Sequence, residues 1–452
     1  MDGNVGTDSR LKMEGIFIYL YDKSDGCVYL WTSDNSSSSP SDNSNSVIKM
    51  TDSEFNQWLA GFIDGEGSFA IVINENIISF RFSIKLHIDD LDALMFIKYR
   101  LNCGNIYIRS DLSSASFELN KISDIQTKLI PLLDKFPLNG IKYLDYLAFK
   151  EAINIKLDES ILKSKKFELI TALKDSMNNK RVNFEMPDTH TIRITPYWLL
   201  GLIEGEGSFS LSNPKTMAIS FTLSLTAAQT PLINAIKNYL GSYIIVDARL
   251  KSSPDYLEII NKIVFVYARK KRREADKPQI EITLKQIKFI HDKFIPMLFE
   301  LNFVTKKYKD FLVWAFIASL IYKGKHTTKA GRELIIKISK SMNRYRLSTY
   351  KHQESKVKIA QSLMDLVLNM DDVYIKGEDG LRIKASDGTL VSRQLFYILA
   401  SGSNGEKLIF KSSDECADYF KVTSQTINVK IAKRQPVLDA NNTEFLLSRK
   451  PI

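Results

Sequence analysis

The chain has 452 residues, of which 44% are hydrophobic, and this is enough to build about three domains of ordinary size. It carries 62 Lys and Arg against 52 Asp and Glu, and the resulting formal charge of +10 favours nucleic acid or an anionic membrane surface as a partner. The longest apolar run, Phe311–Tyr322, is too short to cross a bilayer, and the three cysteines are too far apart for a metal site or a disulfide framework.

The N-terminal region up to residue 50 differs in composition from the rest of the chain. Its first ten residues, MDGNVGTDSR, contain two Asp and no apolar core, so they do not predict a secretory signal. Gly15–Trp31 is apolar and is either a β-hairpin or the remnant of a fused upstream segment. Ser33–Ser46 is rich in Ser and Asn and predicts a flexible linker.

The segment Trp58–Phe69, WLAGFIDGEGSF, occurs a second time as Trp198–Phe209, WLLGLIEGEGSF. Each copy predicts the last turns of an apolar helix. Gly67 and Gly207 stand where a cap glycine would end such a helix. The repetition indicates an internal duplication, with equivalent positions about 140 residues apart.

Small residues and acids share these two predicted helices. Glycines four residues apart leave one face of each helix without side chains, at Gly61 and Gly65 and at Gly201 and Gly205. Two such helices can pair backbone to backbone, and the pairing would bring Glu66 beside Glu206. Because two adjacent carboxylates repel unless a cation lies between them, the duplication predicts a metal-binding pair. Asp64 and Glu204, two residues earlier, are expected to be structural.

Strands with period two follow each motif, at Phe80–His87 and Ser220–Thr226, and this alternation predicts one buried face and one polar exposed face. Helices are predicted at residues 89–101, 122–133, 229–240 and 287–299. Further strands are predicted at Asn105–Arg109, Ala115–Leu119, Tyr243–Arg249 and Lys262–Arg269. Each repeat therefore contains a helix, two strands, a helix, two strands and a helix. Together they form a pseudo-symmetric α+β domain over residues 51–345.

The two repeats differ in length. Lys307–Trp314 matches Lys142–Phe149 at a separation of 165 residues, so the second repeat contains an insertion of about 25 residues between Gly241 and Lys293. The basic run Arg269–Arg273 lies in that region. It is a localisation signal, a solvated tip or a phosphate clamp.

The C-terminal part has a different pattern. Lys351–Met370 predicts a helix, Asp371–Asp387 is loop-like or weakly β, and Tyr397–Phe410 predicts a short hairpin. Ser412–Phe420 and Thr423–Arg434 then predict two short helices, with Ser413 and Thr423 as candidate N-caps. This order indicates a small, mostly helical domain of the helix-turn-helix type that binds DNA.

The paired motifs resemble the signature of the LAGLIDADG homing endonucleases, in the two-motif monomeric branch that organellar introns encode. The resemblance covers about residues 51–345, and Lys323–Asn343 resembles the segment that closes the second repeat in that family. Lys407–Val437 resembles the nuclease-associated modular helix-turn-helix domains. The expected domains are 1–50 (extension and linker), 51–151 and 196–348 (repeats), 152–195 and 349–396 (linkers), and 397–452 (helix-turn-helix domain).

The resemblance implies a duplicated αββαββα fold with two β-saddles and a metal-dependent DNA endonuclease. Glu66 and Glu206 would hold Mg²⁺, for which Mn²⁺ can substitute, with help from backbone carbonyls near Gly65 and Gly205. The enzyme would hydrolyse one phosphodiester per strand and leave short 3′ overhangs. Lys142 and Lys307 would position water or stabilise the developing charge.

The expected substrate is double-stranded DNA with a long, nearly asymmetric site, bound by a monomer in a mitochondrial matrix of the fungal type. The candidate DNA contacts on the saddles are Arg81, Ser83, Lys85, His87, Ser220, Thr222, Ser224 and Thr226, with Arg269, Lys270 and Lys271 beside them. Two alternatives use the same scaffold. One is a maturase that binds its own intron RNA, and the other is a DNA-binding protein that has lost catalysis.

Overall fold

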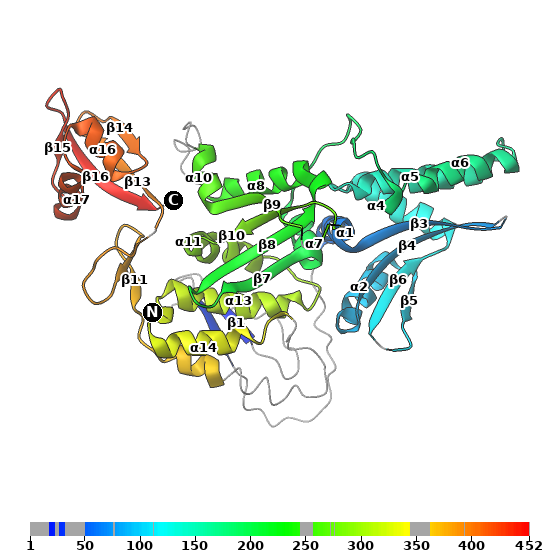
Figure 1. Cartoon of the computed structure of the whole chain (residues 1–452), viewed down its shortest axis with the longest axis horizontal. Helices are drawn as coiled ribbons and strands as arrows, with labels where there is room; N and C mark the ends of the chain where they lie inside the picture. Colours follow the sequence, from blue (N-terminus) through cyan, green and yellow to red (C-terminus); the bar gives the residue numbers. More distant parts are fainter. Residues whose placement is uncertain are drawn as a thin grey trace, which may run out of the picture.

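The computed structural model describes residues 18–22, 27–31, 50–75, 77–111, 113–244, 256–271, 273–274, 276–343, 362–392 and 394–451. Two α+β halves lie side by side, and a smaller C-terminal domain lies beyond the second half (Figure 1). The predicted duplication is therefore visible in the architecture. In both halves a motif helix leads directly into the first strand of a four-stranded antiparallel sheet.

The first half begins with the motif helix α1 (Asp52–Glu66), which Thr51 caps through the amide of Glu54. Its sheet has the strand order β3-β4-β6-β5. The strands are β3 (Gly67–Asn74), β4 (Ile77–His87), β5 (Asn105–Ile108) and β6 (Ser114–Leu119). The helices that follow or cover them are α2 (Leu91–Leu101), α3 (Ile122–Asp124), a π-turn (Ile125–Leu129), α4 (Ile130–Lys135), α5 (Lys142–Leu157) and α6 (Lys163–Asp175).

The second half repeats this order from the motif helix α7 (Pro196–Glu206), with the sheet order β7-β8-β10-β9. The strands are β7 (Gly207–Asn213), β8 (Ala218–Thr226), β9 (Val264–Arg269) and β10 (Gln279–Leu284). The helices are α8 (Thr230–Ile244), α10 (Tyr256–Ile263), α11 (Ile287–Phe289), a π-turn (Ile290–Phe294), α12 (Ile295–Phe299), α13 (Lys307–Tyr322) and α14 (Lys329–Ser339).

Two strands of the second half differ from the prediction. The strand expected at Tyr243–Arg249 is wrong in its described part, because residues 243 and 244 continue helix α8, and the remaining residues lie outside the described ranges. The strand expected from Lys262 begins only at Val264, since helix α10 ends at Ile263. The strand that the sequence analysis did not predict is β10, which pairs with both β8 and β9. The described part of the insertion is thus helix α10, and the basic run begins at the end of β9.

The glycines that end the motif helices act differently from the prediction. Gly67 has a φ of −71° and is extended, so it is not a left-handed cap. A Cβ at Gly67 would lie 2.6 Å from Cγ2 of Ile63, and one at Gly207 would lie 2.7 Å from the carbonyl oxygen of Ile203. Glycine is needed at these positions for space, because the chain turns sharply from helix into strand.

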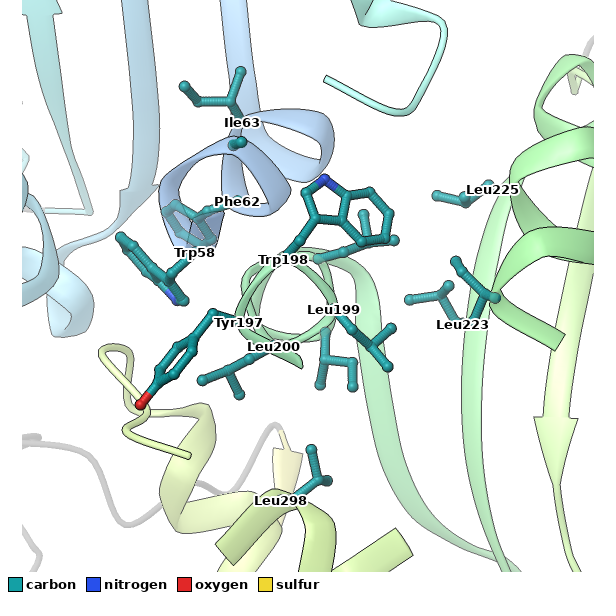
Figure 2. Packing of buried hydrophobic residues seen from close by; sticks show 14 of the residues in the cluster. Trp58, Phe62, Ile63, Tyr197, Trp198, Leu199, Leu200, Leu223, Leu225 and Leu298 are labelled. Atoms are coloured by element: carbon teal, nitrogen blue, oxygen red, sulfur yellow. The ribbon is translucent and has the colours of Figure 1, made fainter. Parts of the chain in front are cut away.

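The core runs through both halves and across the helix pair. Figure 2 looks along helix α7 and shows Trp58 and Phe62 of α1 on one side, with Leu223 and Leu225 of β8 and Leu298 beyond it. The outer helices cover the sheets in equivalent ways. Phe69 lies 5.4 Å from Phe149 of α5, and Phe209 lies 5.1 Å from Trp314 of α13, between ring centroids.

The segment that closes each repeat has the same anchor. Asn178 donates from its backbone to Asp145 and from its side chain to the carbonyl oxygen of Phe69, at 3.0 Å each. Asn343 makes the matching bonds to Asp310 and to the carbonyl oxygen of Phe209, at 2.8 and 3.1 Å. The closing role expected of Lys323–Asn343 therefore has a counterpart at the end of the first repeat.

The N-terminal region contains a β-hairpin, which is one of the two alternatives predicted for Gly15–Trp31. Strand β1 (Ile18–Asp22) pairs with β2 (Cys27–Trp31). The Ser/Asn-rich tract lies outside the described residues. Within the described ranges, no helix is long and apolar enough to cross a membrane.

The C-terminal part is less helical than predicted. Residues 362–368 are helical, and β11 (Tyr374–Lys376) pairs with β12 (Arg382–Lys384). The final domain is a four-stranded antiparallel sheet of order β14-β13-β16-β15 with two helices on it. Its elements are β13 (Phe396–Gly402), β14 (Lys407–Phe410), α16 (Ser413–Phe420), α17 (Ser424–Lys433), β15 (Val437–Leu438) and β16 (Glu444–Pro451).

The prediction of a mostly helical domain missed strand β16, in which Phe445 and Leu447 alternate with exposed residues and enter the domain core. The two short helices and the hairpin are confirmed. Thr423 caps α17 as expected, but Ser412 rather than Ser413 caps α16 through the amide of Glu415.

Candidate active site

The two motif helices, α1 and α7, touch through their glycines. A Cβ at Gly61 would lie 1.9 Å from the carbonyl oxygen of Trp198, and one at Gly201 would lie 2.1 Å from that of Trp58. Real Cβ atoms do not approach so closely, so only glycine permits this contact. The predicted backbone-to-backbone pairing is present.

This contact places Glu66 and Glu206 together at the ends of the two helices. A Cβ on Gly205 would lie 3.4 Å from Cγ of Glu66, and one on Gly65 would lie 3.5 Å from Cγ of Glu206. Burial raises the pKa of both carboxyls, and the charge of Glu206 raises the pKa of Glu66 further. The pair is therefore an electrostatically unfavourable arrangement that a cation would relieve.

Each glutamate has a lysine of its own half beside its backbone. The Nζ atom of Lys142 donates to the carbonyl oxygens of Ile63, at 3.1 Å, and Gly65. The Nζ atom of Lys307 donates to those of Ile203, Gly205 and Gly207, at 3.1, 3.1 and 2.7 Å. Burial lowers the pKa of Lys142, and the carboxylates of Asp64, Glu206 and Glu66 counteract this. The two ammonium groups fix the ends of the helices that carry the acids.

Asp64 and Glu204 hold the halves together, in keeping with the structural role expected for them. Each accepts a hydrogen bond from the tryptophan of the other half. Trp198 Nε1 donates to Asp64 at 3.0 Å, and Trp58 Nε1 donates to Glu204 at 2.6 Å. Burial raises the pKa of Asp64 to about 6 and that of Glu204 to about 7.

Both buried acids also fix the loop that precedes a lysine-bearing helix. Asp64 accepts from the amides of Asn139 and Gly140, at 2.8 and 2.9 Å, just before Lys142. Glu204 accepts from the amides of Val304 and Thr305, at 3.0 and 2.6 Å, just before Lys307. The sequence motif thus positions the lysine as well as the glutamate of each half.

The predicted DNA contacts of the first half lie together on one face of strand β4. Arg81, Lys85 and His87 are exposed and Ser83 is half-buried, while the intervening residues enter the core. Ser83 and Lys85 pair across the sheet with Glu118 and Ser116 of β6. The face is polar along β4 and β6, whereas Ala70 and Val72 of β3 pair with Arg81 and Ser79 at its edge.

The predicted contacts of the second half lie on strand β8 and are more enclosed. Thr222, Ser224 and Thr226 are half-buried, but Ser220 is only 1% exposed and its hydroxyl bonds to Ser210 at 3.1 Å. Ser220 is therefore wrong as an accessible contact, because its side chain is buried beside Ser210 of the neighbouring strand β7. Trp314 of α13 donates to the carbonyl oxygen of Ser220 at 3.1 Å.

The missed strand β10 brings further polar groups to this face. Glu281 accepts from Ser224 at 2.6 Å, from Thr283 at 3.1 Å and from Tyr267, and these bonds lower its pKa. Tyr267 is 43% exposed, and its counterpart on β5 is Tyr107, which is 49% exposed. The alternation of Ile280, Ile282 and Leu284 in the sequence is the signal that could have revealed this strand.

The basic run lies at the open end of the same sheet. Arg269 ends β9 and lies 3.9 Å from Glu281, while Lys270 and Lys271 are exposed in the connection to β10. The run therefore borders the polar face. Among the described residues, no three His, Cys, Asp or Glu side chains form a cluster that could hold a metal ion.

This duplicated fold, with paired motif helices and an acid pair at their ends, defines a class of nuclease-like proteins. Residues 59–153 and 199–262 match the family model described as LAGLIDADG endonuclease. The two segments that carry the repeated motif are therefore LAGLIDADG endonuclease repeats.

Three similar proteins agree with this assignment. The uncharacterized mitochondrial protein RF1 of Saccharomyces cerevisiae is 29% identical over 71% of this chain and 65% of its own length. The probable intron-encoded endonuclease Cox1-I1b of Schizosaccharomyces pombe is 33% identical over 41% of this chain and 49% of its own. The LAGLIDADG homing endonuclease I-GzeII, solved in complex with a DNA target, is 25% identical with a TM-score of 0.51, over 64% of this chain and 99% of that one. The chain thus spans about half to two thirds of the curated relatives it matches.

Proposed function

We propose that the chain is a site-specific DNA endonuclease that cuts both strands of a duplex with divalent metal held by Glu66 and Glu206. The observation that carries the proposal is the pairing of these two acids, one from each half, at the ends of helices that only glycine allows to touch. The two acids are related by pseudo-symmetry. This arrangement suits a DNA duplex, because its two sugar-phosphate backbones are related by two-fold symmetry even where the base sequence is not. One phosphodiester on each strand would then be hydrolysed, with short 3′ overhangs.

The donor set fits Mg²⁺, with Mn²⁺ as a substitute. Two carboxylates whose pKa values are raised by burial, and for Glu66 also by the other charge, gain from a shared hard cation. The carbonyl oxygens of Gly65 and Gly205 already accept from Lys142 and Lys307, so they would bind metal only through their second lone pairs. When bound, the metal would supply an activated water and neutralise charge on the phosphate.

The protein's own groups have separate tasks. Lys142 and Lys307 hold the helix ends in place through backbone carbonyls, and their positive charge beside the acid pair favours a phosphate there. The polar faces of the two sheets would lie along the major groove and contact base edges. Arg81 and Lys85 on one sheet, and Arg269 to Lys271 at the end of the other, would bind phosphates or guanine edges.

The two sheet faces differ, so the proposed target is asymmetric. The first carries Arg81, Lys85 and His87 on its central strand, whereas the second carries hydroxyl groups and the carboxylate of Glu281. Neutral and acidic groups accept from exocyclic amines, and basic groups prefer guanine acceptors. Each half of a single chain would therefore select a different half-site, as expected for a monomer.

The test begins with a target selected from random duplex DNA by the intact protein in EDTA, because binding need not depend on cleavage. The selected duplex should then be cut on both strands in Mg²⁺ and spared in EDTA. The double variant Glu66→Gln with Glu206→Gln should bind the duplex with wild-type affinity and cut at least 100-fold more slowly. Glu151→Gln, an exposed glutamate on α5, serves as the matched control and should cut normally. Cleavage by the double variant at the wild-type rate would overturn the assignment.

A further inference from the structure

Among the described residues, helix α10 of the second half has no counterpart in the first half, and the first half has a groove at the equivalent place. Helix α2 and helix α8 are equivalent, because their buried residues lie 139 positions apart. The pairs are Leu94 and Ile233, Ile97 and Ile236, and Leu101 and Leu240. Between α8 and its edge strand the second half inserts helix α10, whereas three residues, Asn102–Gly104, join α2 to β5.

Helix α10 packs onto α8 through apolar residues and one polar contact. Ile259, Ile260 and Ile263 are buried, and Ile260 packs so closely on Gly241 that a Cβ there would lie 2.6 Å from its Cδ1. The Nζ atom of Lys237 donates to Oδ1 of Asn261 on α10. A short amphipathic helix, α10, thus covers the surface of α8 around Lys237 and Gly241.

The equivalent surface of α2 is a groove of about 730 Å³. It is lined by Met95, Lys98, Tyr99, Arg100, Asn102 and Cys103. Lys98 and Asn102 are the counterparts of Lys237 and Gly241, the positions that α10 contacts in the second half. Volumes of this size are typical of binding sites.

Two of the side chains that line the groove are apolar and exposed. Met95 is 50% exposed and Tyr99 is 78% exposed. Their counterparts on α8, which already has its covering helix, are the exposed residues Asn234 and Asn238. Neighbouring exposed apolar residues beside a groove mark interaction sites more often than isolated exposed apolar residues do.

We propose that the groove on α2 binds an amphipathic helix of a partner protein, which lies where α10 lies on α8 and also covers Met95 and Tyr99, whose counterparts α10 leaves exposed. The partner helix would carry two or three aliphatic residues in the pattern of Ile259, Ile260 and Ile263, and an acceptor side chain opposite Lys98. A second copy of this chain is a poorer occupant, because its own α10 already buries those isoleucines against α8. This is recognition of an amphipathic helix in a groove with apolar and polar lining residues, and it is independent of the nuclease activity.

The probe for the test is a peptide of residues 254–266, whose helix is fixed by a lactam between Glu258 and Lys262. These side chains already form an ion pair one turn apart and are about half exposed, so the bridge leaves the apolar face free. The peptide carries a fluorescent label, and its anisotropy is measured against the full-length protein. Saturable binding is expected, and a peptide of the same composition in scrambled order should not bind.

Two variants locate the binding. Met95→Glu with Tyr99→Glu should weaken the peptide at least 10-fold, and the matched pair Asn234→Glu with Asn238→Glu should change it less than twofold. Lys98→Met should weaken the native peptide and have no effect on one in which Asn261 is alanine. Equal melting temperatures for the two double variants exclude unfolding as the cause.

Three outcomes would overturn the proposal. The first is absence of saturable binding to the wild-type protein, and the second is an equal loss in the α2 and α8 double variants. The third is self-association of the protein, in sedimentation without peptide, that only the α2 variant abolishes. That result would assign the face to a second copy of the chain.

Discussion

Replacing Gly61 by alanine is the sharpest perturbation of the helix pair. The new Cβ would lie 1.9 Å from the carbonyl oxygen of Trp198 and 2.7 Å from its carbonyl carbon. Ordinary contact begins at 3.4 Å, so the two helices would have to separate by 3.4 − 1.9 = 1.5 Å. The obstacle is backbone, and no side-chain rotation can relieve it.

Two effects of opposite sign decide the stability of the Gly61→Ala variant. Alanine in place of glycine inside a helix stabilises by about 0.5–1 kcal/mol. Overpacking of a well-packed interface costs about 1–3 kcal/mol, and the buried tryptophans on both sides place this site at the upper end of that range. We therefore expect a net loss of about 1–2 kcal/mol. Displacement of Glu66 from Glu206 by about 1 Å should slow cleavage about 100-fold.

Urea unfolding and single-turnover cleavage of the selected duplex measure the two effects separately. Gly65→Ala is the comparison within the same helix, since its Cβ would lie 3.3 Å from Gly205 and needs a shift of only tenths of an ångström. It should be no less stable than wild type. If Gly61→Ala were more stable than wild type and cut at the normal rate, the backbone contact between the halves would be wrong.

Three further changes test other parts of the molecule. The double variant Glu66→Gln with Glu206→Gln lacks two carboxylates whose folded pKa values are raised, so its melting temperature without metal should be higher, by about 2–4 °C per kcal/mol gained. The gain should be present at pH 7 and should fade as the pH falls below 4.5, the ordinary pKa of these groups, because both acids then become protonated in either state. Trp58→Phe removes a hydrogen-bond donor to the buried carboxylate of Glu204 and should lower the free energy of unfolding by about 1–3 kcal/mol. Because the pKa of Glu204, already about 7, then rises further, this loss of stability should grow as the pH increases above 7. A loss of stability that does not depend on pH would contradict the prediction. Lys325→Met removes the buried ammonium group that donates to the carbonyl oxygens of residues 367, 368 and 370. A protease should therefore cleave the segment 362–376 faster in limited proteolysis. An unchanged cleavage rate would show that Lys325 does not anchor this segment.

The repeated motif made most of the first half predictable. The spacing of Gly61 and Gly65 against Gly201 and Gly205 indicated a helix pair, and the alternation in Phe80–His87 indicated a half-buried strand. Both patterns are local, because each depends only on how residue types are spaced along a short stretch of sequence. The structure contains both, and the family match covers the same segments.

The second half was harder because an insertion interrupts its pattern. Residues 243 and 244 have strand-like side chains, but they continue α8, and Ile260 of α10 packs against that helix at Gly241. Strand β10 was missed because Glu281 lies at its centre. Only the sheet shows why the carboxylate is tolerated there, since hydroxyl groups from three neighbouring strand positions satisfy it.

The sequence by itself determined the duplication, the two acids and the lysines that follow them, because these are properties of residue type and spacing. Tertiary structure alone decided that each buried acid bonds to the tryptophan of the other half, and that the same acid anchors the loop before the lysine. These contacts join residues 75 to 146 positions apart, and no local period encodes them. Folding is what places Glu66 beside Glu206.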